Sequence, residues 1–363
     1  MKILFDCRYV RVDRHDGISR YSVGLVAALA RLHPVTVLVS DRAQLARLPD
    51  LPHRLVSGPT SIREPLLACA VRRLAPDVVF SPMQTMGSWG RDYRLVLTLH
   101  DLIYYRNRTP PPEFAAPIRL LWRLYHLAWW PQRLLLNRAD VVATISATTA
   151  ALIAKYRLTR RPVRIVGNAP QHGHTPRDSG AGADKTLLYM GSFMPYKNVE
   201  TMIRGMAELP DMSLHLLSRI TAERRAELEA LAPAGADIVF HNGVTDAEYE
   251  AMLGHTTALI SLSRAEGYGL PLVEAMSHGT PVIASDIPIF REVGGDAVSY
   301  VHPDSPAEFA AAVRELEDPD FWKSRSRRSV ERAAGFSWDE SARRLLAAAE
   351  EALALRADRP GTM

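Results

Sequence analysis

Short apolar runs alternate with amphipathic segments along the first half of the chain. Between the runs lie segments of helical length, such as 17–32 and 147–156. Apolar runs without polar alternation are typical of parallel strands covered on both faces, so we predict a doubly wound α/β sheet. The predicted strands of this half lie at 2–6, 34–39, 77–81, 95–99, 139–145 and 163–168.

The same alternation starts again after a stretch rich in Gly, Pro and His at 171–184, which is typical of a linker. We therefore predict two Rossmann-like domains, at 1–170 and 185–338, followed by an Ala-rich terminal helix within 339–363. A length of 363 residues also suggests two domains. The predicted strands of the second half lie at 185–190, 213–217, 237–240, 257–262 and 280–284.

One stretch of the second half combines a strand, a glycine turn and a helix start. The run 257–262 leads to Gly267 and Gly269, which let the main chain approach a ligand closely. Pro271 suits the first helical position, and Gly279 ends the predicted helix.

Backbone amides of 268–272, which include Tyr268 and Leu270, should therefore point out of this helix start and favour a phosphate group. Glu266 precedes the turn and Glu274 lies one turn into the helix, and both can accept hydrogen bonds from hydroxyl groups. A sugar nucleotide has this layout of a diphosphate between two polyhydroxylated rings. An acid at a helix start can also simply favour the helix dipole.

A second predicted phosphate cradle follows the strand 185–190. Gly191 and Ser192 form a loop, and Lys197 stands just before the next helix. Lysine is rare in this chain, where only five of the 44 basic residues are Lys.

Two further positions of the first half point to ligand binding. His100 and Asp101 follow the strand 95–99, at the sheet edge where α/β proteins bind ligands, although a lone His is often structural. Gly17 opens the helix 17–32 and permits close approach of a ligand, but an ordinary turn explains it equally well. No GxGxxG follows the first strand, which argues against a nicotinamide dinucleotide.

Composition narrows the class of protein. The net charge of +4 with a pI near 9.1 does not by itself indicate nucleic acid binding. Cys7 and Cys69 form no CxxC pair and are expected to be reduced core thiols. His172 and His174 lack further ligands nearby, so no metal site is predicted. Without a signal peptide or an apolar run long enough to span a bilayer, a cytoplasmic protein is expected.

The segment 113–136 allows two interpretations. Between 102 and 138 there are six Arg and one acid, Glu113, a net charge of +5. Such a helix can lie on an anionic membrane, or it can pack against its own sheet with the Arg side chains in solvent. The apolar stripe in helical spacing consists of Ile118, Trp122, Tyr125 and Trp129.

The string from Glu266 to Glu274 resembles the Glu-x7-Glu motif of the retaining glycosyltransferase family 4, and the resemblance extends over nearly the whole chain. It implies the GT-B fold, with two Rossmann-like domains facing a cleft and a last helix that crosses back to the first domain. It implies an N-terminal acceptor domain and a C-terminal domain for the nucleotide sugar. Carried over, Glu266 lies near the donor sugar and Glu274 binds the ribose.

The resemblance assigns further roles. Lys197 would neutralise the diphosphate, His100 would face the donor sugar, and main chain at Val244 would read the base. Many relatives carry Arg directly after the loop glycine, where this chain has Ser192, so Arg219 is our candidate for the second positive charge. No metal is needed if these groups carry the charge.

The expected activity is transfer of a hexose, with retention, to a hydroxyl of a glycan or lipid-linked glycan in polysaccharide or glycolipid biosynthesis. A lipid-linked acceptor would place the enzyme at the inner face of the membrane. The strings Leu99 to Leu102 and Gly191 to Asn198 resemble those of bacterial mannosyltransferases, so GDP-mannose is the first choice of donor and UDP-sugars the second. A sugar-nucleotide isomerase or hydrolase, and a non-catalytic nucleotide-sugar binder, remain alternatives.

Overall fold

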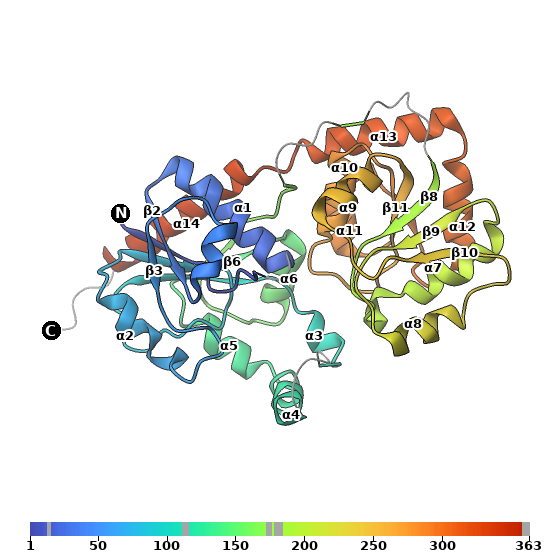
Figure 1. Cartoon of the computed structure of the whole chain (residues 1–363). Coiled ribbons are helices and arrows are strands. Elements are labelled where there is room, and N and C mark those ends of the chain that lie inside the picture. The colour runs from blue at the N-terminus through green and yellow to red at the C-terminus, as the bar shows by residue number, and fades with distance from the viewer. Residues whose placement is uncertain (13–15, 111–115, 172–175, 178–183, 358–363) are drawn as a thin grey trace. The chain divides into compact units, whose positions relative to one another are not determined.

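The structure is a computed structural model that describes residues 1–12, 16–110, 116–171, 176–177 and 184–357. The chain forms two compact units, one of residues 1–169 with 337–363 and the other of residues 170–336 (Figure 1). The first unit therefore takes in the last helix, as the resemblance implied. Parts of the expected linker, with His172 and His174, lie outside the described residues.

The first unit is built on a parallel sheet of seven strands in the order β3-β2-β1-β4-β5-β6-β7. This order reverses direction between β1 and β4, which makes that point the switch point of a Rossmann-like sheet. The strands are β1 Ile3–Asp6, β2 Val35–Val39, β3 His53–Leu55, β4 Val78–Ser81, β5 Arg94–Leu99, β6 Val141–Thr144 and β7 Val163–Ile165.

Helices cover both faces of this sheet (Figure 1). They are α1 Gly17–Leu32, η1 Arg42–Arg47, η2 Glu64–Leu66, α2 Leu67–Arg72, α3 Ile103–Arg106, α4 Ala116–Tyr125, α5 Trp130–Leu136, α6 Ala147–Lys155 and α14 Trp338–Ala357.

The last helix, α14, packs along α1 (Figure 1). Trp338 is only 2% exposed, and its ring would come within 2.3 Å of a Cβ atom at position 24. Gly24 therefore lets the two helices approach closely. Ser341 Oγ donates a hydrogen bond to the Gly167 carbonyl at 2.9 Å, which joins α14 to the end of the first sheet.

The second unit has a parallel sheet of six strands in the order β10-β9-β8-β11-β12-β13, again with one reversal, here between β8 and β11. Its strands are β8 Asp184–Tyr189, β9 Ser213–Leu216, β10 Asp237–Phe240, β11 Thr256–Ser261, β12 Val282–Ser285 and β13 Ser299–Val301. Its helices are η3 Pro195–Lys197, α7 Val199–Gly205, η4 Met206–Glu208, α8 Ala222–Glu229, α9 Asp246–Leu253, α10 Leu270–Ser277, α11 Pro288–Gly294, α12 Pro306–Glu315 and α13 Pro319–Ala333.

The two Rossmann-like sheets confirm the expected α/β fold class. The sequence predicted neither β3 nor β13, because each has only three residues and is too short to form an apolar run. The expectation that both cysteines are core thiols is wrong for Cys69, which is exposed on α2, whereas Cys7 is buried.

The segment predicted at 113–136 forms two helices, α4 and α5, and residues 113–115, with Glu113, lie outside the described residues. Three members of the predicted stripe turn inward, where Trp129 stacks on Tyr105 at 3.9 Å between ring centroids and Trp122 meets Tyr104 at 5.0 Å. The exposed apolar face of this segment consists instead of Ile118, Leu120, Leu121, Leu124, Leu127, Trp130 and Leu134.

Candidate active site

Two of the predicted site residues meet at the switch point of the second sheet. Strands β8 and β11 pair in parallel there, so the loops after them leave the same edge side by side. Lys197, at the end of η3, forms an ion pair with Glu266, from Nζ to Oε1. Each of the two side chains is 14% exposed. Lys197, which is predicted to contact the diphosphate, is thus paired with Glu266, which is predicted to contact the sugar.

Asn198 fixes the position of Lys197. Its backbone has φ 57° and ψ 41°, a left-handed conformation that Asn tolerates better than most residues. The buried side-chain amide donates to the Leu262 carbonyl at 3.1 Å and to the Pro303 carbonyl at 2.5 Å. Thr201 Oγ1 donates to Asn198 Oδ1 at 2.9 Å. The lysine loop is therefore tied to the end of β11.

Ser263 fixes the position of Glu266. Its hydroxyl lies 3.1 Å from Glu266 Oε1, the same oxygen that meets Lys197. The Ser263 carbonyl accepts a hydrogen bond from Ser285 Oγ at 2.5 Å, which holds this loop against β12. Ser263 and Asn198 were not predicted as site residues, although each stands within three residues of a predicted catalytic side chain.

The helix α10 starts directly after a tight turn at Gly269. Gly269 has φ 97°, and a Cβ atom at this position would lie 2.8 Å from the Phe290 ring. The expected cradle of amides from 268–272 is too wide, because Pro271 has no N–H and the Leu272 amide donates to the Gly269 carbonyl at 3.0 Å. The cradle therefore ends at Leu270, the first residue of the helix.

Glu274 lies in the second turn of α10 and is 5% exposed, and Tyr268 is 8% exposed. The Tyr268 ring meets Phe336 edge to face at 6.5 Å between centroids. Both residues belong to the same loop and helix as Glu266, as the sequence predicted.

The other predicted donor ligands lie on neighbouring loops of the same unit. The Gly191 amide donates to Ser218 Oγ at 3.2 Å, and the Ser192 carbonyl accepts from Tyr189 Oη at 2.6 Å. Exposed Arg219 lies over Gly243, whose missing Cβ would be 3.0 Å from Arg219 Cγ, next to Val244. Arg219 thus flanks the loop predicted to read the base.

Comparison with known proteins decides the family. The family described as "Glycosyl transferases group 1" matches residues 175–334, which include every predicted site residue of the second unit. The family described as "Glycosyltransferase Family 4" matches residues 15–169. The chain belongs to these glycosyltransferases. The predictions of an enzyme of the hexosyltransferase class and of the family are therefore confirmed.

Two curated relatives of this glycosyltransferase are named as O-antigen chain mannosyltransferases. The chain is 25% identical to the O-antigen chain mannosyltransferase RfbU of Salmonella typhimurium, over 84% of this chain and 88% of that protein. It is 27% identical to the O-antigen chain mannosyltransferase B of Escherichia coli, over 93% and 97%.

A solved structure shows the same fold. Anabaena HepE, crystallised with UDP-glucose, matches with a TM-score of 0.69 over 96% of this chain and 99% of its own, at 18% identity. The GT-B fold predicted from the sequence is confirmed by this likeness and by the two sheets.

In the first unit of the glycosyltransferase, His100 lies at the carboxyl edge of the sheet as predicted. Its Nε2 lies 2.7 Å from the Pro82 carbonyl, so this nitrogen carries the proton and donates it. Burial lowers the pKa of His100 to about 4, although the Pro82 carbonyl and Asp16 act in the opposite direction. The ring is therefore neutral near pH 7 and presents Nδ1 as an acceptor.

The neighbouring predicted residues Asp101 and Gly17 lie at the starts of helices. Asp101 Oδ1 accepts a hydrogen bond from the Ile103 amide at 3.0 Å at the start of α3. Gly17 is the first residue of α1, and Asp16 caps this helix by accepting from the Ser19 amide at 2.8 Å. The donor-binding role of Gly17 stays a prediction.

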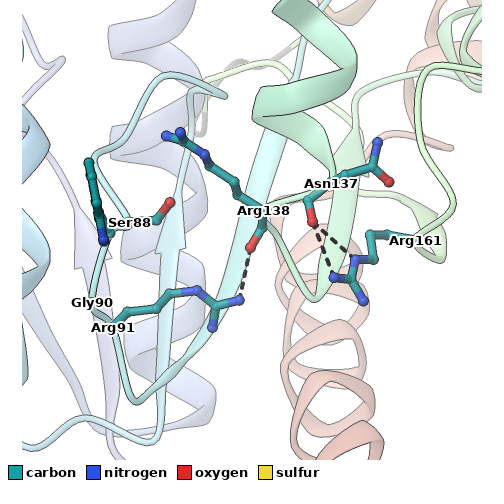
Figure 2. Close-up of a pocket in the computed structure, with 7 residues that line it drawn as sticks. Ser88, Gly90, Arg91, Asn137, Arg138 and Arg161 are labelled. Atoms are coloured by element: carbon teal, nitrogen blue, oxygen red, sulfur yellow. Dashed lines mark hydrogen bonds between the residues drawn. The ribbon is translucent and has the colours of Figure 1, made fainter.

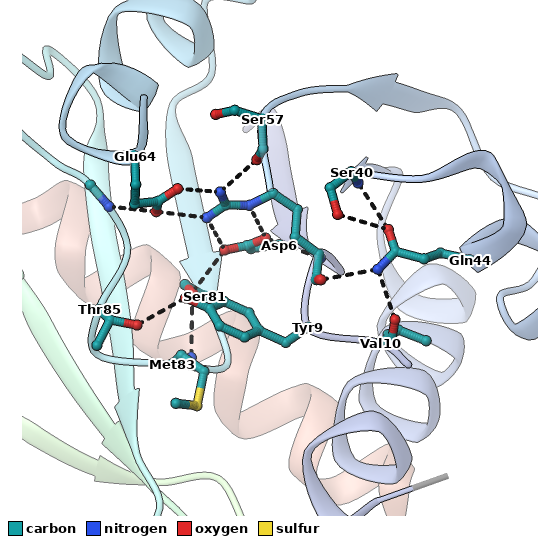
Figure 3. Close-up of polar contacts among 12 residues, drawn as sticks. Asp6, Tyr9, Val10, Ser40, Gln44, Ser57, Glu64, Ser81, Met83 and Thr85 are labelled. Atoms are coloured by element: carbon teal, nitrogen blue, oxygen red, sulfur yellow. Dashed lines mark hydrogen bonds and ion pairs between the residues drawn. The ribbon is translucent and has the colours of Figure 1, made fainter. Parts of the chain in front are cut away.

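A buried ion-pair network, absent from the sequence predictions, occupies the switch point of the first sheet (Figure 3). Arg8 uses all five of its N–H groups, two on Asp6, two on Glu64 and one on the Ser57 carbonyl. Burial alone would lower the pKa of Arg8, but the two carboxylates outweigh it and raise this pKa. Ser81 Oγ donates to Asp6 Oδ2 at 3.0 Å.

Within the described residues, no three His, Cys, Asp or Glu side chains are grouped as metal ligands. In the same part of the chain, no helix is long and apolar enough to cross a membrane.

Proposed function

We propose that this glycosyltransferase binds a nucleotide-sugar donor at the switch point of its second unit and transfers the sugar with retention of anomeric configuration. The observation that carries the proposal is the pairing of Lys197 with Glu266 beside the start of α10. A cation and a helix start are the two groups that a diphosphate favours, and the acid beside them suits a sugar hydroxyl.

Donor binding exchanges the partners of this ion pair. The diphosphate competes with Glu266 for Lys197, because two phosphate groups offer more negative charge than one carboxylate. Glu266, released from Lys197 but still held by Ser263, then accepts hydrogen bonds from sugar hydroxyls. As the bond to the sugar breaks, charge grows on the leaving diphosphate, and Lys197 stabilises it without a metal ion.

For the donor we propose GDP-mannose, supported by the mannosyltransferase names of both curated relatives. A UDP-sugar is the second candidate, because a neighbour of the same fold was crystallised with UDP-glucose. The base would lie on the main chain near Val244, with Arg219 beside it.

For the acceptor we propose a hydroxyl of a glycan or lipid-linked glycan, since the curated relatives are named for O-antigen chains. We further propose that the first unit touches the inner face of an anionic membrane through α4 and α5. Leu121 is 68% exposed and Trp130 is 65% exposed, and Arg119 and Arg123 flank the exposed leucines. Exposed apolar side chains beside arginines favour an anionic lipid surface.

The test measures sugar transfer with GDP-mannose and UDP-glucose by purified wild type, Lys197→Ala and Glu266→Gln. Each variant is expected to lose roughly 100-fold or more in turnover, because charge stabilisation or sugar positioning is lost. Lys185→Ala is the matched control, as Lys185 lies on β8 of the same unit, with its side chain 66% exposed. Near wild-type turnover of a folded Lys197→Ala protein contradicts the proposal.

Two further readouts separate the alternatives. Donor consumption without any acceptor identifies an isomerase or hydrolase, and donor binding without turnover identifies a binder. The anomeric configuration of the product, read by NMR, decides between retention and inversion.

A further inference from the structure

A basic pocket opens on the first unit at the sheet edge opposite His100. It lies where β5, β6 and β7 begin, has a volume of about 460 Å³ and is lined by arginines of three different loops (Figure 2). The described residues that line it include Trp89, Arg91, Arg138 and Arg161 and no acidic side chain. The proposed donor site lies in the second unit and shares no residue with this pocket.

The arginines are held mainly by neutral groups, so much of their positive charge is left unbalanced. Arg161 donates from Nε and Nη2 to the Asn137 carbonyl, both at 3.2 Å, and Arg91 Nη2 donates to the Arg138 carbonyl at 2.8 Å (Figure 2). Asp140 is shared between Arg91, at 2.7 Å, and Arg94, at 2.8 Å. Arginines that are held largely by carbonyl groups, with one carboxylate shared between Arg91 and Arg94, keep positive charge that suits a phosphate.

The pocket adjoins the C-terminal end of α5, whose exposed apolar side chains include Trp130 and Leu134, 65% and 51% exposed. Arg138 lies in the turn just after this helix, where its amide donates a hydrogen bond to the Leu135 carbonyl at 3.1 Å. The exposed apolar side chains of α5 are therefore followed directly by one arginine of the pocket. On the opposite wall, Trp89 is 79% exposed.

We propose that this pocket binds the phosphate of an anionic phospholipid headgroup while Trp89, Trp130 and Leu134 enter the bilayer interface. The inference rests on the membrane contact proposed above and names the group that is recognised. Interfacial tryptophans with arginines at headgroup depth complement such a surface in both polarity and charge. A soluble phosphate ester shares the chemistry but would leave the apolar stripe in water.

The test compares vesicle binding of two double variants that remove the same charge. Arg138→Gln/Arg161→Gln removes two positive charges from the pocket lining. Arg54→Gln/Arg63→Gln removes two exposed arginines elsewhere on the same unit. Partitioning onto vesicles of 30% phosphatidylglycerol in phosphatidylcholine is measured by co-sedimentation. The pocket variant is expected to bind at least about tenfold more weakly than the control variant.

Several outcomes would contradict the proposal that this pocket binds a phospholipid headgroup. Equal losses in both double variants show diffuse attraction, with the membrane contact intact. Equal binding of wild type to pure phosphatidylcholine, or none to either vesicle, removes the membrane contact itself. Tight binding of glycerol 1-phosphate in solution, with no gain from the bilayer, assigns the pocket to a soluble ester.

Two control experiments test folding and donor binding of the variants separately. Arg138→Gln alone changes one exposed side chain and should still lower vesicle binding measurably. GDP should raise the melting temperature of the pocket variant as it does for wild type, because the donor site lies in the other unit. If GDP does not raise the melting temperature of wild type either, the proposed donor site fails. The vesicle result then still decides on the phospholipid pocket, because it does not depend on GDP binding.

Discussion

The two switch points of the glycosyltransferase hold the same kinds of group in different states. In the first unit, the side chains of Arg8 and Asp6 are fully buried, and Glu64 is 13% exposed. All five N–H groups of Arg8 are used. In the second unit, Lys197 and Glu266 remain 14% exposed and lie beside a helix start.

The difference separates a structural pair from one that can exchange partners. The Arg8 guanidinium, with every donor satisfied, joins the end of β1 to the Ser57 carbonyl and to Glu64 at the start of η2, and releasing it would leave charges buried. The Lys197 ammonium has three donors, and it pairs with a single oxygen of Glu266 that also accepts a hydrogen bond from Ser263. Only the second pair can give up a partner to an incoming anion at low cost.

The largest expected effect tests this contrast on stability. Arg8→Met should lower the free energy of unfolding by about 3–5 kcal/mol, because two carboxylates lose their buried partner. Lys197→Met should lower it by less than about 1 kcal/mol, since water reaches Glu266. Urea unfolding of both variants measures the difference. Equal losses would show that the second pair is as structural as the first.

The fold could be predicted from the sequence because apolar runs mark buried parallel strands. Lys197 and Glu266 could be proposed singly from their loops, but not as partners. Their pairing depends on the register of β8 beside β11 and on the left-handed conformation of Asn198, neither of which leaves a periodic signal.

The network around Arg8 could not be predicted for a similar reason. Asp6 and Arg8 are two apart at a strand end, which is typical of exposed charges, and Glu64 lies 56 residues further along the chain. In the segment 113–136 the helical period could not tell which apolar side chains pack inward. Trp122 and Trp129 pack on Tyr104 and Tyr105 of the first unit, whereas the leucines of α4 stay exposed.

A second prediction concerns charge at the edge of the first sheet. Because burial lowers the pKa of His100 to about 4, the folded protein keeps this ring neutral while the unfolded chain binds a proton below about pH 6.5. The contribution of the neutral His100 ring to the free energy of unfolding is constant above pH 6.5 and is lost as the pH falls towards 4. At pH 5 wild type should lose about 2 kcal/mol more stability than His100→Gln does, relative to pH 7.5. Parallel pH profiles of the two proteins would contradict a neutral His100.

The smallest expected effect compares two matched serines. Ser81 donates to Asp6 at 3.0 Å and Ser263 to Glu266 at 3.1 Å, so each hydroxyl holds the carboxylate of one switch point. Ser81→Ala should cost about 1.5 kcal/mol of stability, because Asp6 is buried and loses a donor. Ser263→Ala should cost less than about 1 kcal/mol, since water can replace the hydroxyl at Glu266.

Turnover should respond in the opposite order. Without Ser263, Glu266 is free to turn away from the sugar once the diphosphate has taken Lys197, so kcat should fall by about tenfold with little change in donor affinity. Ser263→Thr keeps the hydroxyl and should recover most of the rate. Ser81→Ala, measured below its melting temperature, should transfer sugar at the wild-type rate. If Ser81→Ala slows transfer as much as Ser263→Ala, the first switch point takes part in the reaction and the contrast between the two units fails.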